Sequence, residues 1–213
     1  MKILYVFPHP DDESYGPARV MSKQRRQGHQ VYLLTLTKGG ATKQRFKYGY
    51  SVQEMGQVRY QEMKCVEKVL DLSGMTVLDL PDSGLKQMDP RSIEQAVTDG
   101  IAQIEPDIVV TYAVHGISGF HDHLVTHAVV KRAYFVLAER VDYLQRLAFY
   151  TITQQEAAKS THFHLSGSDP SEIDVVVQVD SVDVARLQEA LDCYRIYQDA
   201  IEQSGIREMV GSE

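Results

Sequence analysis

The chain has 213 residues, of which 43% are hydrophobic, and its formal net charge at pH 7 is −7. A chain of this length typically folds around one core, so residues 1–213 are predicted to form a single domain. The acidic balance argues against a protein that coats nucleic acids or adheres to anionic membranes.

Targeting and redox signals are weak. No run approaches the ~20 apolar residues of a membrane-spanning helix, and Pro8 cuts the apolar start too short for a secretory signal. Cys65 and Cys193 fall in predicted helices far apart in the sequence, which favours reduced core thiols over a disulfide. We therefore expect a cytoplasmic protein with no membrane or nucleic-acid partner; a homo-oligomer is compatible with the sequence.

Predicted strands and helices alternate through most of the chain. Apolar runs predict strands at residues 3–7, 31–37, 76–80, 107–112, 147–153 and 173–179. Helical spacing of apolar residues predicts helices at 17–27, 52–71, 91–104, 123–140 and 182–203. Several strands are continuously apolar, as are strands covered on both faces. The sequence thus predicts an α/β fold with a Rossmann-like, mainly parallel sheet, helices on both faces, and a C-terminal strand and helix.

The segment PHPDDES, residues 8–14, follows the first predicted strand and lacks the glycine fingerprint of a dinucleotide-binding turn. It places His9 next to Asp11, Asp12 and Glu13. Neighbouring carboxylates repel one another and would repel phosphates, and a bound divalent cation removes both difficulties. The alternative is that the acids only cap the helix that follows.

A second segment, HGISGFHDHLVTH at residues 115–127, holds four of the eight histidines. Both segments follow predicted strands, and ligands bind at the C-terminal ends of strands in such sheets. A catalytic zinc typically takes three protein ligands, which His9, Asp12 and one histidine of the second segment would supply. Asp11 would then remain as a base for an attacking water, and the set describes hydrolysis of a carbonyl compound.

These segments together resemble the LmbE or PIG-L family of zinc-dependent de-N-acetylases. The resemblance covers about residues 1–155 and includes Arg59 with Glu62 in a predicted helix and LPDSG at 80–84. It is greatest to the branch that deacetylates N-acetylglucosaminyl malate in bacillithiol biosynthesis. The chain is therefore predicted to remove the acetyl group from an N-acetylglucosamine conjugate, with that malate conjugate as the leading candidate.

The resemblance implies roles for the matched residues. His9, Asp12 and His123 would hold one Zn²⁺ per chain, with Fe²⁺ as an alternative, and Asp11 would be the general base. The substrate is expected to be a small amino-sugar conjugate, whose hydroxyls Arg59 and Asp82 would hold.

The chain departs from the family at the catalytic histidine that precedes the last ligand by three residues, because Phe120 stands there. His121 is predicted to take over its role of stabilising the oxyanion, and His115 is the alternative. His127, one helical turn after the last ligand, is predicted to be a packed or supporting histidine. Cys193-Tyr194 also departs, since many relatives carry a histidine there.

The loop at residues 38–50 contains Lys38, Lys43, Arg45 and Lys47 and no acidic residue. It is either a solvated lid or a site that attracts a dicarboxylate such as malate. Three other functions remain open on the residues alone. They are an amidase for other N-acetylglucosamine conjugates (bacillithiol S-conjugates or diacetylchitobiose), a metallo-phosphoesterase, and a non-catalytic sugar- or nucleotide-binding module with a structural metal.

Overall fold

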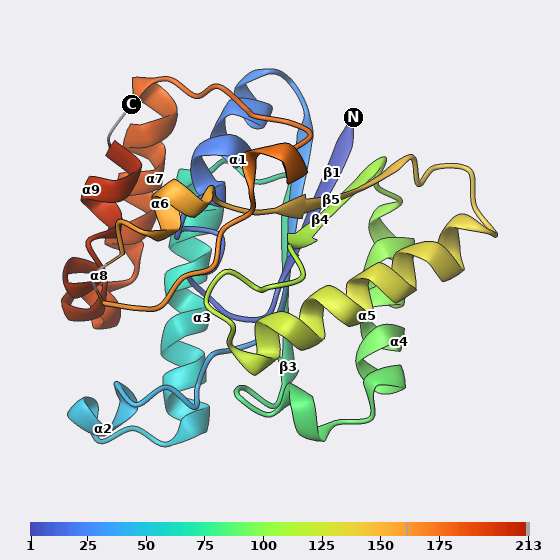
Figure 1. Ribbon diagram of the computed structural model, residues 1–213. Helices are drawn as coiled ribbons and strands as arrows, with labels where there is room; N and C mark the ends of the chain where they lie inside the picture. Colours follow the sequence, from blue (N-terminus) through green and yellow to red (C-terminus); the bar gives the residue numbers. More distant parts are fainter. Residues whose placement is uncertain (161, 212–213) are drawn as a thin grey trace.

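One parallel sheet of five strands forms the centre of the protein. The structure is a computed structural model that describes residues 1–160 and 162–211. The strand order is β3-β2-β1-β4-β5 (Figure 1). The strands are β1 (Lys2–Phe7), β2 (Gln30–Thr37), β3 (Gly74–Leu80), β4 (Ile108–Tyr112) and β5 (Arg146–Tyr150). In the middle of the sheet Tyr5 of β1 lies between Leu33 and Val110. The predicted α/β class and the first five strands are confirmed.

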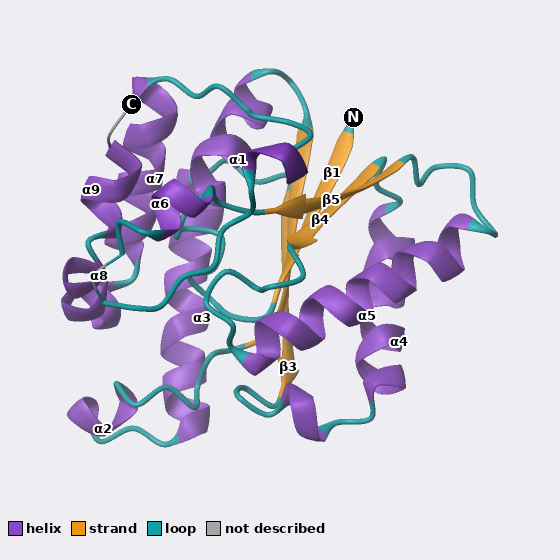
Figure 2. Cartoon of the chain, in the orientation of Figure 1, coloured by secondary structure: helices purple, strands orange, loops and turns teal. Residues whose placement is uncertain are grey.

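Helices cover both faces of the sheet (Figure 2). One face is covered by α1 (Pro17–Arg26), α3 (Val52–Val69) and α7 (Ser181–Cys193), and the other by α4 (Pro90–Ile104) and α5 (His121–Ala138). Side chains of β1 alternate between these layers: Phe7 belongs to the core under the first group of helices, whereas Leu4 and Val6 belong to the core under the second. Burial on both faces explains why β1 is continuously apolar.

Short elements complete the chain. They are the helices α2 (Arg45–Tyr48), α6 (Gln154–Ala157), α8 (Gln198–Ser204) and α9 (Ile206–Gly211) and the 3₁₀ turns η1 (Leu85–Gln87), η2 (Pro170–Glu172) and η3 (Arg195–Tyr197). In the described part of the chain, no helix has the length and apolar character needed to cross a bilayer.

Two predictions for the C-terminal part of the chain are wrong. The predicted helix at 182–203 is broken after Cys193, because Tyr194 leaves the helical conformation with φ −85° and ψ 68°. The predicted strand at 173–179 joins no sheet, and Val175 and Val176 are 69% and 71% exposed. A β-branched run favours an extended backbone, but a strand also needs a neighbouring edge to satisfy its hydrogen bonds.

The expectation of reduced thiols is also wrong. Cys65 of α3 and Cys193 at the end of α7 form a disulfide, with their Cα atoms 5.7 Å apart across a sequence separation of 128. The two helices pack side by side on the same face of the sheet. That proximity is a property of the fold, which the spacing of two cysteines within separate helical patterns does not reveal.

A buried carboxylate fixes α7 to α1. Asp183, whose side chain is fully buried, accepts hydrogen bonds from the Ser22 hydroxyl (2.9 Å) and from Nε and an Nη atom of Arg26 (3.1 and 2.9 Å). These bonds set the position of α7, and therefore of the residue that follows it, Tyr194.

We expect Asp183→Ala to lower the free energy of unfolding by about 2–3 kcal/mol, measured by urea denaturation, because it removes a charged acceptor from the Ser22 hydroxyl, the Arg26 guanidinium and the backbone N–H of Asp180. Asp199→Ala is the matched control: that carboxylate is 63% exposed and pairs with Lys47 on the surface, so the change should be at most about 0.5–1 kcal/mol. Equal losses in the two variants would contradict a structural role for Asp183.

Candidate active site

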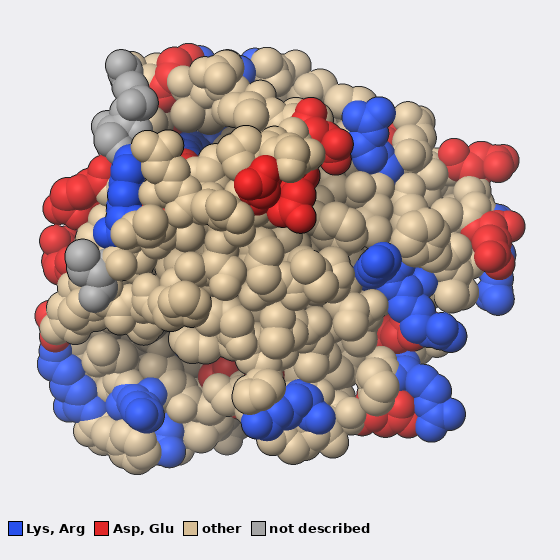
Figure 3. Space-filling view, viewed as in Figure 1, with Lys and Arg blue, Asp and Glu red and all other residues tan. Residues whose placement is uncertain are grey.

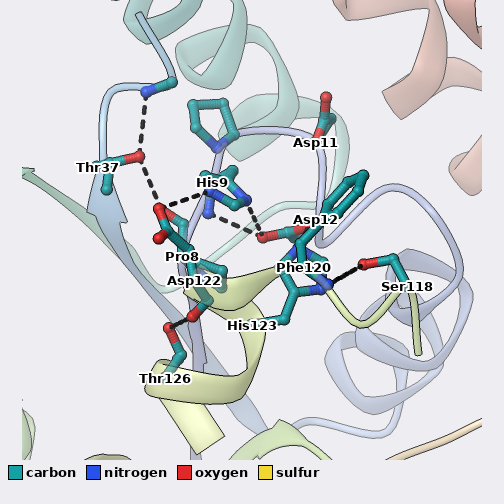
Figure 4. A network of polar contacts seen from close by, with 12 residues as sticks. Pro8, His9, Asp11, Asp12, Thr37, Ser118, Phe120, Asp122, His123 and Thr126 are labelled. Carbon is teal, nitrogen blue, oxygen red and sulfur yellow. Dashed lines mark hydrogen bonds and ion pairs between the residues drawn. The ribbon is translucent and has the colours of Figure 1, made fainter. Parts of the chain in front are cut away.

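The site lies where the order of the strands reverses. β1 and β4 are neighbours, and the chain leaves β1 toward α1 on one face and β4 toward α5 on the other. This divergence opens a crevice at the C-terminal ends of the two strands, where ligands bind in open α/β sheets. The structure brings together His9 and Asp12 from the first loop with His123 from the start of α5, and one ligand atom of each lies within 4.8 Å of the others (Figure 4).

Asp12 lies between the two imidazoles. Its Oδ2 is 3.5 Å from Nδ1 of His9, and its Oδ1 is 3.3 Å from Nε2 of His123. The Tyr112 hydroxyl donates to Oδ1 at 2.8 Å, and the backbone N–H of His9 donates to Oδ2 at 2.8 Å. Asp12 is only 6% exposed, so these contacts hold its carboxylate in one orientation.

The outer ring nitrogens of both histidines are already bound to protein. Nε2 of His9 is 3.3 Å from Oδ2 of Asp122, and Nδ1 of His123 is 2.9 Å from the carbonyl oxygen of Gly116. Histidines that bind metals usually donate their second ring N–H to a carboxylate or carbonyl in this way. The inner nitrogens are left facing Asp12, so the donor set fits a divalent cation. Sequence reasoning used Asp122 only as a family signature and missed this orienting contact.

The charges of the cluster require a positive partner. Burial alone would lower the pKa of His9, but hydrogen bonds to Asp12 and Asp122 raise it to about 10. Burial alone would raise the pKa of Asp12, but His123 and His9 hold it well below its ordinary value. Protonated His9 therefore supplies the compensating charge that a bound cation would otherwise supply.

A second group of possible ligands shares His9 and adds Asp82 and Asp122. In this group Asp82 accepts a hydrogen bond from the backbone N–H of Ala41 at 2.6 Å, and Asp122 accepts one from that of Leu85 at 3.3 Å. The group contains one imidazole, whereas the group around Asp12 contains two. Zinc takes imidazole readily, so the group around Asp12 is the better zinc site.

Asp11 is held apart from the imidazoles. Its backbone has a φ of +83°, which is uncommon for a residue with a side chain, and two contacts support it. An Nη atom of Arg59 donates to its carboxylate at 2.6 Å, and its own N–H donates to the Tyr194 hydroxyl at 2.8 Å. Burial raises the pKa of Asp11 to about 6, although Arg59 opposes the shift. A carboxylate with this pKa is ionised at neutral pH and can accept a proton.

Tyr194 is a residue at the site to which sequence reasoning assigned no role. It is fully buried, and its hydroxyl donates to Oε1 of Glu13 at 2.6 Å while accepting from Asp11. The Ser14 hydroxyl also donates to that oxygen, at 2.7 Å. Burial raises the pKa of Glu13 to about 7. The only signal in the sequence was the departure at Cys193-Tyr194 from the histidine that the family resemblance implies there.

The two residues expected to hold sugar hydroxyls also line the cavity beside the cluster. Arg59 is 3% exposed and is held by the carbonyl oxygens of Pro10 (2.7 Å) and Gly39 (3.2 Å), with its guanidinium 4.2 Å from the ring centre of Tyr197. Asp82 has one oxygen 3.5 Å from Nε2 of His9. The structure therefore places both near the cluster, although protein groups already contact much of their polar surface.

The histidines expected near the oxyanion lie elsewhere. His121 is exposed, its Nδ1 is 3.5 Å from Nζ of Lys86, and it is absent from the described cavity lining, which Phe120 joins. His115 accepts from the N–H of Ile117 at 3.0 Å, has its Nε2 3.3 Å from the Thr151 hydroxyl, and is also absent from the described cavity lining. His127 is buried and donates to the Tyr112 carbonyl at 2.8 Å, as a supporting residue would.

The sequence of this chain is similar to those of known deacetylases. Residues 4–134 match the sequence model of the family described as PIG-L: GlcNAc-PI de-N-acetylase. A protein of Bacillus subtilis, named probable N-acetyl-alpha-D-glucosaminyl L-malate deacetylase 2, is 28% identical over 134 residues, covering 62% of this chain and 60% of that protein. The chain spans about half to two thirds of the length of the curated relatives it matches.

Two solved structures share the fold at low identity. One is the A40926 pseudoaglycone deacetylase Dbv21, with a TM-score of 0.71, 18% identity and coverage of 94% of this chain and 84% of the other. The other is GalB, a 4-carboxy-2-hydroxymuconate hydratase of Pseudomonas putida, with a TM-score of 0.64, 13% identity and coverage of 98% and 82%. Because a hydratase shares the fold, the reaction has to be argued from the site.

We expect Asp122→Asn to weaken zinc binding about 10- to 100-fold, because the amide no longer fixes the orientation of His9 as a carboxylate does. A competition titration with a chelator of known affinity measures the change. Asp79→Asn is the control, since that carboxylate is 78% exposed and pairs with Lys38. An unchanged affinity in the first variant would show that Asp122 does not support the metal site.

The buried Glu13 predicts a pH-dependent stability of the metal-free protein. Its pKa is about 7 when folded and 4.5 ordinarily, so the folded protein binds more protons between these values and loses stability as the pH rises. Between pH 4.5 and 7 the free energy of unfolding of the wild type should fall by on the order of 3 kcal/mol, and in Glu13→Gln this fall should be absent. Urea denaturation at each pH measures it. Glu189→Gln, at an exposed position, should keep the wild-type slope. A wild-type slope in Glu13→Gln would contradict the shifted pKa.

Proposed function

Because the chain belongs to the PIG-L family, we propose that it is a metal-dependent hydrolase that removes the acetyl group from an N-acetylglucosamine conjugate. One observation carries the proposal: Asp12 lies between two correctly oriented imidazoles, while Asp11 stays outside that set with a pKa near neutrality. A site of this kind combines a place for a Lewis acid with a separate proton acceptor.

A cation held by His9, Asp12 and His123 would polarise the amide carbonyl as a Lewis acid; zinc suits these donors, and ferrous iron is the alternative. Asp11 accepts a proton from the attacking water as the carbonyl carbon becomes tetrahedral. The C–N bond then breaks, Asp11 gives its proton to the leaving nitrogen, and the free amine and acetic acid depart, the acid losing its remaining proton to solvent. The hydrogen bond from Arg59 keeps the Asp11 carboxylate in a fixed orientation during both proton transfers.

The oxyanion donor is the part of the mechanism for which this chain departs from its family. His121 is our proposed donor, and it would have to move from its exposed position beside Lys86 with the first turn of α5. Arg59 and Asp82 are proposed to hold sugar hydroxyls, supported by their place in the lining of the cavity.

The group attached to the sugar determines which conjugate is the substrate. The family description specifies GlcNAc-PI and the Bacillus subtilis relative an N-acetylglucosaminyl malate, so the named substrates share the acetylated sugar and differ in what is attached to it. The malate conjugate of bacillithiol biosynthesis is one candidate, favoured by that relative and by the basic loop. In that loop, however, Lys47 pairs with Asp199 and Arg45 lies 3.9 Å from the ring centre of Phe46.

A metallo-phosphoesterase is the second candidate, favoured by the group of possible ligands at His9, Asp82 and Asp122. Two-metal phosphoesterases hold their ions about 3.5–4 Å apart. Elemental analysis of the metal-loaded protein separates the two proposals: one ion per chain supports the deacetylase and two support the phosphoesterase.

The decisive variant is Asp11→Asn, which keeps the shape of the side chain and removes the base. We expect kcat to fall about 10²–10⁴-fold, with unchanged metal content, on whichever of N-acetylglucosaminyl malate, N-acetylglucosamine or diacetylchitobiose the wild type hydrolyses. Released amine is the readout. Asp71→Asn, at a carboxylate that is 83% exposed, serves as the control. Full activity of Asp11→Asn would rule out the mechanism.

A further inference from the structure

The cavity beside the metal-ligand cluster has a volume of about 360 Å³ and a wall that the proposed chemistry does not use. We call this the apolar wall. It consists of aliphatic and aromatic side chains: Ile117, Ile152, Phe163, Leu165, Ile206 and Met209. Because the same cavity also contains His9 and Asp11, the cluster and this wall face one continuous space.

The apolar wall is held in place by backbone contacts. The N–H of Ser166 donates to the carbonyl of Ile117 at 2.7 Å, and the N–H of Ser168 donates to the carbonyl of Ile152 at 2.8 Å. The segment after α6 is thereby attached both to the loop after β4 and to the chain after β5. These segments cross the middle of the view in Figure 1, and most of that region carries no Lys, Arg, Asp or Glu in Figure 3. The part of the wall formed by Ile117, Ile152 and Leu165 is thus preformed rather than assembled by the ligand.

Charged groups near the wall are few and partly compensated. Arg19 and Lys159 line the cavity, and an Nη atom of Arg19 is 4.0 Å from a carboxylate oxygen of Glu156. Lys43 and Lys47 of the basic loop are absent from its described lining. The side chains of the wall itself offer a dicarboxylate no hydrogen-bond donor, and only Arg19 and Lys159 beside it could do so, whereas an alkyl or aryl group would gain from burial against the wall.

We propose that the apolar wall binds an apolar aglycone, an alkyl or aryl group attached to the amino sugar. The inference rests on the proposed function and specifies its substrate class. Except for Ile117, the wall lies after residue 134, outside the segment that matches the family, whereas the ligand cluster, Arg59 and Asp82 lie inside it. Residues 4–134, which match the family, therefore contact the acetylated sugar that the named substrates have in common. The segment after residue 134 contacts the attached group, which differs between those substrates.

The test is a series of N-acetylglucosaminides with methyl, butyl and octyl aglycones, assayed by released amine. Burial of each methylene group is worth up to about fourfold, so kcat/KM should rise at least tenfold from methyl to octyl. A second series lengthens the N-acyl group from acetyl to hexanoyl on the methyl glycoside, and it should show no such rise.

Leu165→Asn keeps the approximate size of the side chain and makes the wall polar. It should reduce the ratio of octyl to methyl kcat/KM at least fivefold, with Leu165→Ala as a second variant if the first does not fold. Val176→Asn is the matched control, because Val176 is 71% exposed and lies outside the cavity lining. Its ratio should equal that of the wild type.

A flat aglycone series on an enzyme that hydrolyses the methyl glycoside overturns the inference and leaves the proposed function standing. A rise only in the acyl series, or a preference for the malate conjugate over the octyl glycoside, also overturns it. If no amide is hydrolysed, the proposed function fails, and calorimetry with octyl glucoside decides the inference separately. Saturable binding weakened tenfold by Leu165→Asn supports it, and absence of binding refutes it.

Discussion

Compensation of two adjacent buried carboxylates is the constraint on which the rest of this structure depends. Asp11 and Asp12 follow the central strand and line the cavity with side chains only 16% and 7% exposed, so an unpaired carboxylate there would cost several kcal/mol. Asp12 is compensated by two imidazoles and Asp11 by a guanidinium. Burial raises the pKa of Asp11 to about 6 although its guanidinium partner opposes the shift, whereas at Asp12 the two imidazoles outweigh burial and lower the pKa. The proposed roles of Asp12 as a ligand and Asp11 as a base rest on this difference.

The sheet provides these compensating groups by its strand order. β1 and β4 are adjacent, so the loops that follow them meet even though His9 and His123 are more than a hundred residues apart in sequence. α3 brings Arg59 to the Asp11 carboxylate, and the end of α7 places the Tyr194 hydroxyl between the Asp11 backbone N–H and the Glu13 carboxylate. Rigid elements thus fix the positions of side chains that lie on or next to loops, as precise chemistry requires.

The C-terminal part of the chain is integral to the site. Tyr194 bonds both Asp11 and Glu13, and the preceding residue, Cys193, is joined to α3 by the disulfide. The same part of the chain also forms most of the apolar wall. The segment that matches the family holds the ligand cluster, and the later segment supports the base and lines the space beyond it.

Local patterns in the sequence determined the sheet and the cluster. Burial on both faces gives β1 a continuous apolar run and its neighbours β2 and β4 mostly apolar ones, and the loops after β1 and β4 concentrate acids and histidines over a few residues. Only the tertiary structure decided that Cys65 meets Cys193, that the chain bends at Tyr194, that residues 173–179 pair with no strand, and that His121 points toward Lys86. Each of these depends on which element lies alongside another, and a pairing across many residues leaves no periodicity in either partner.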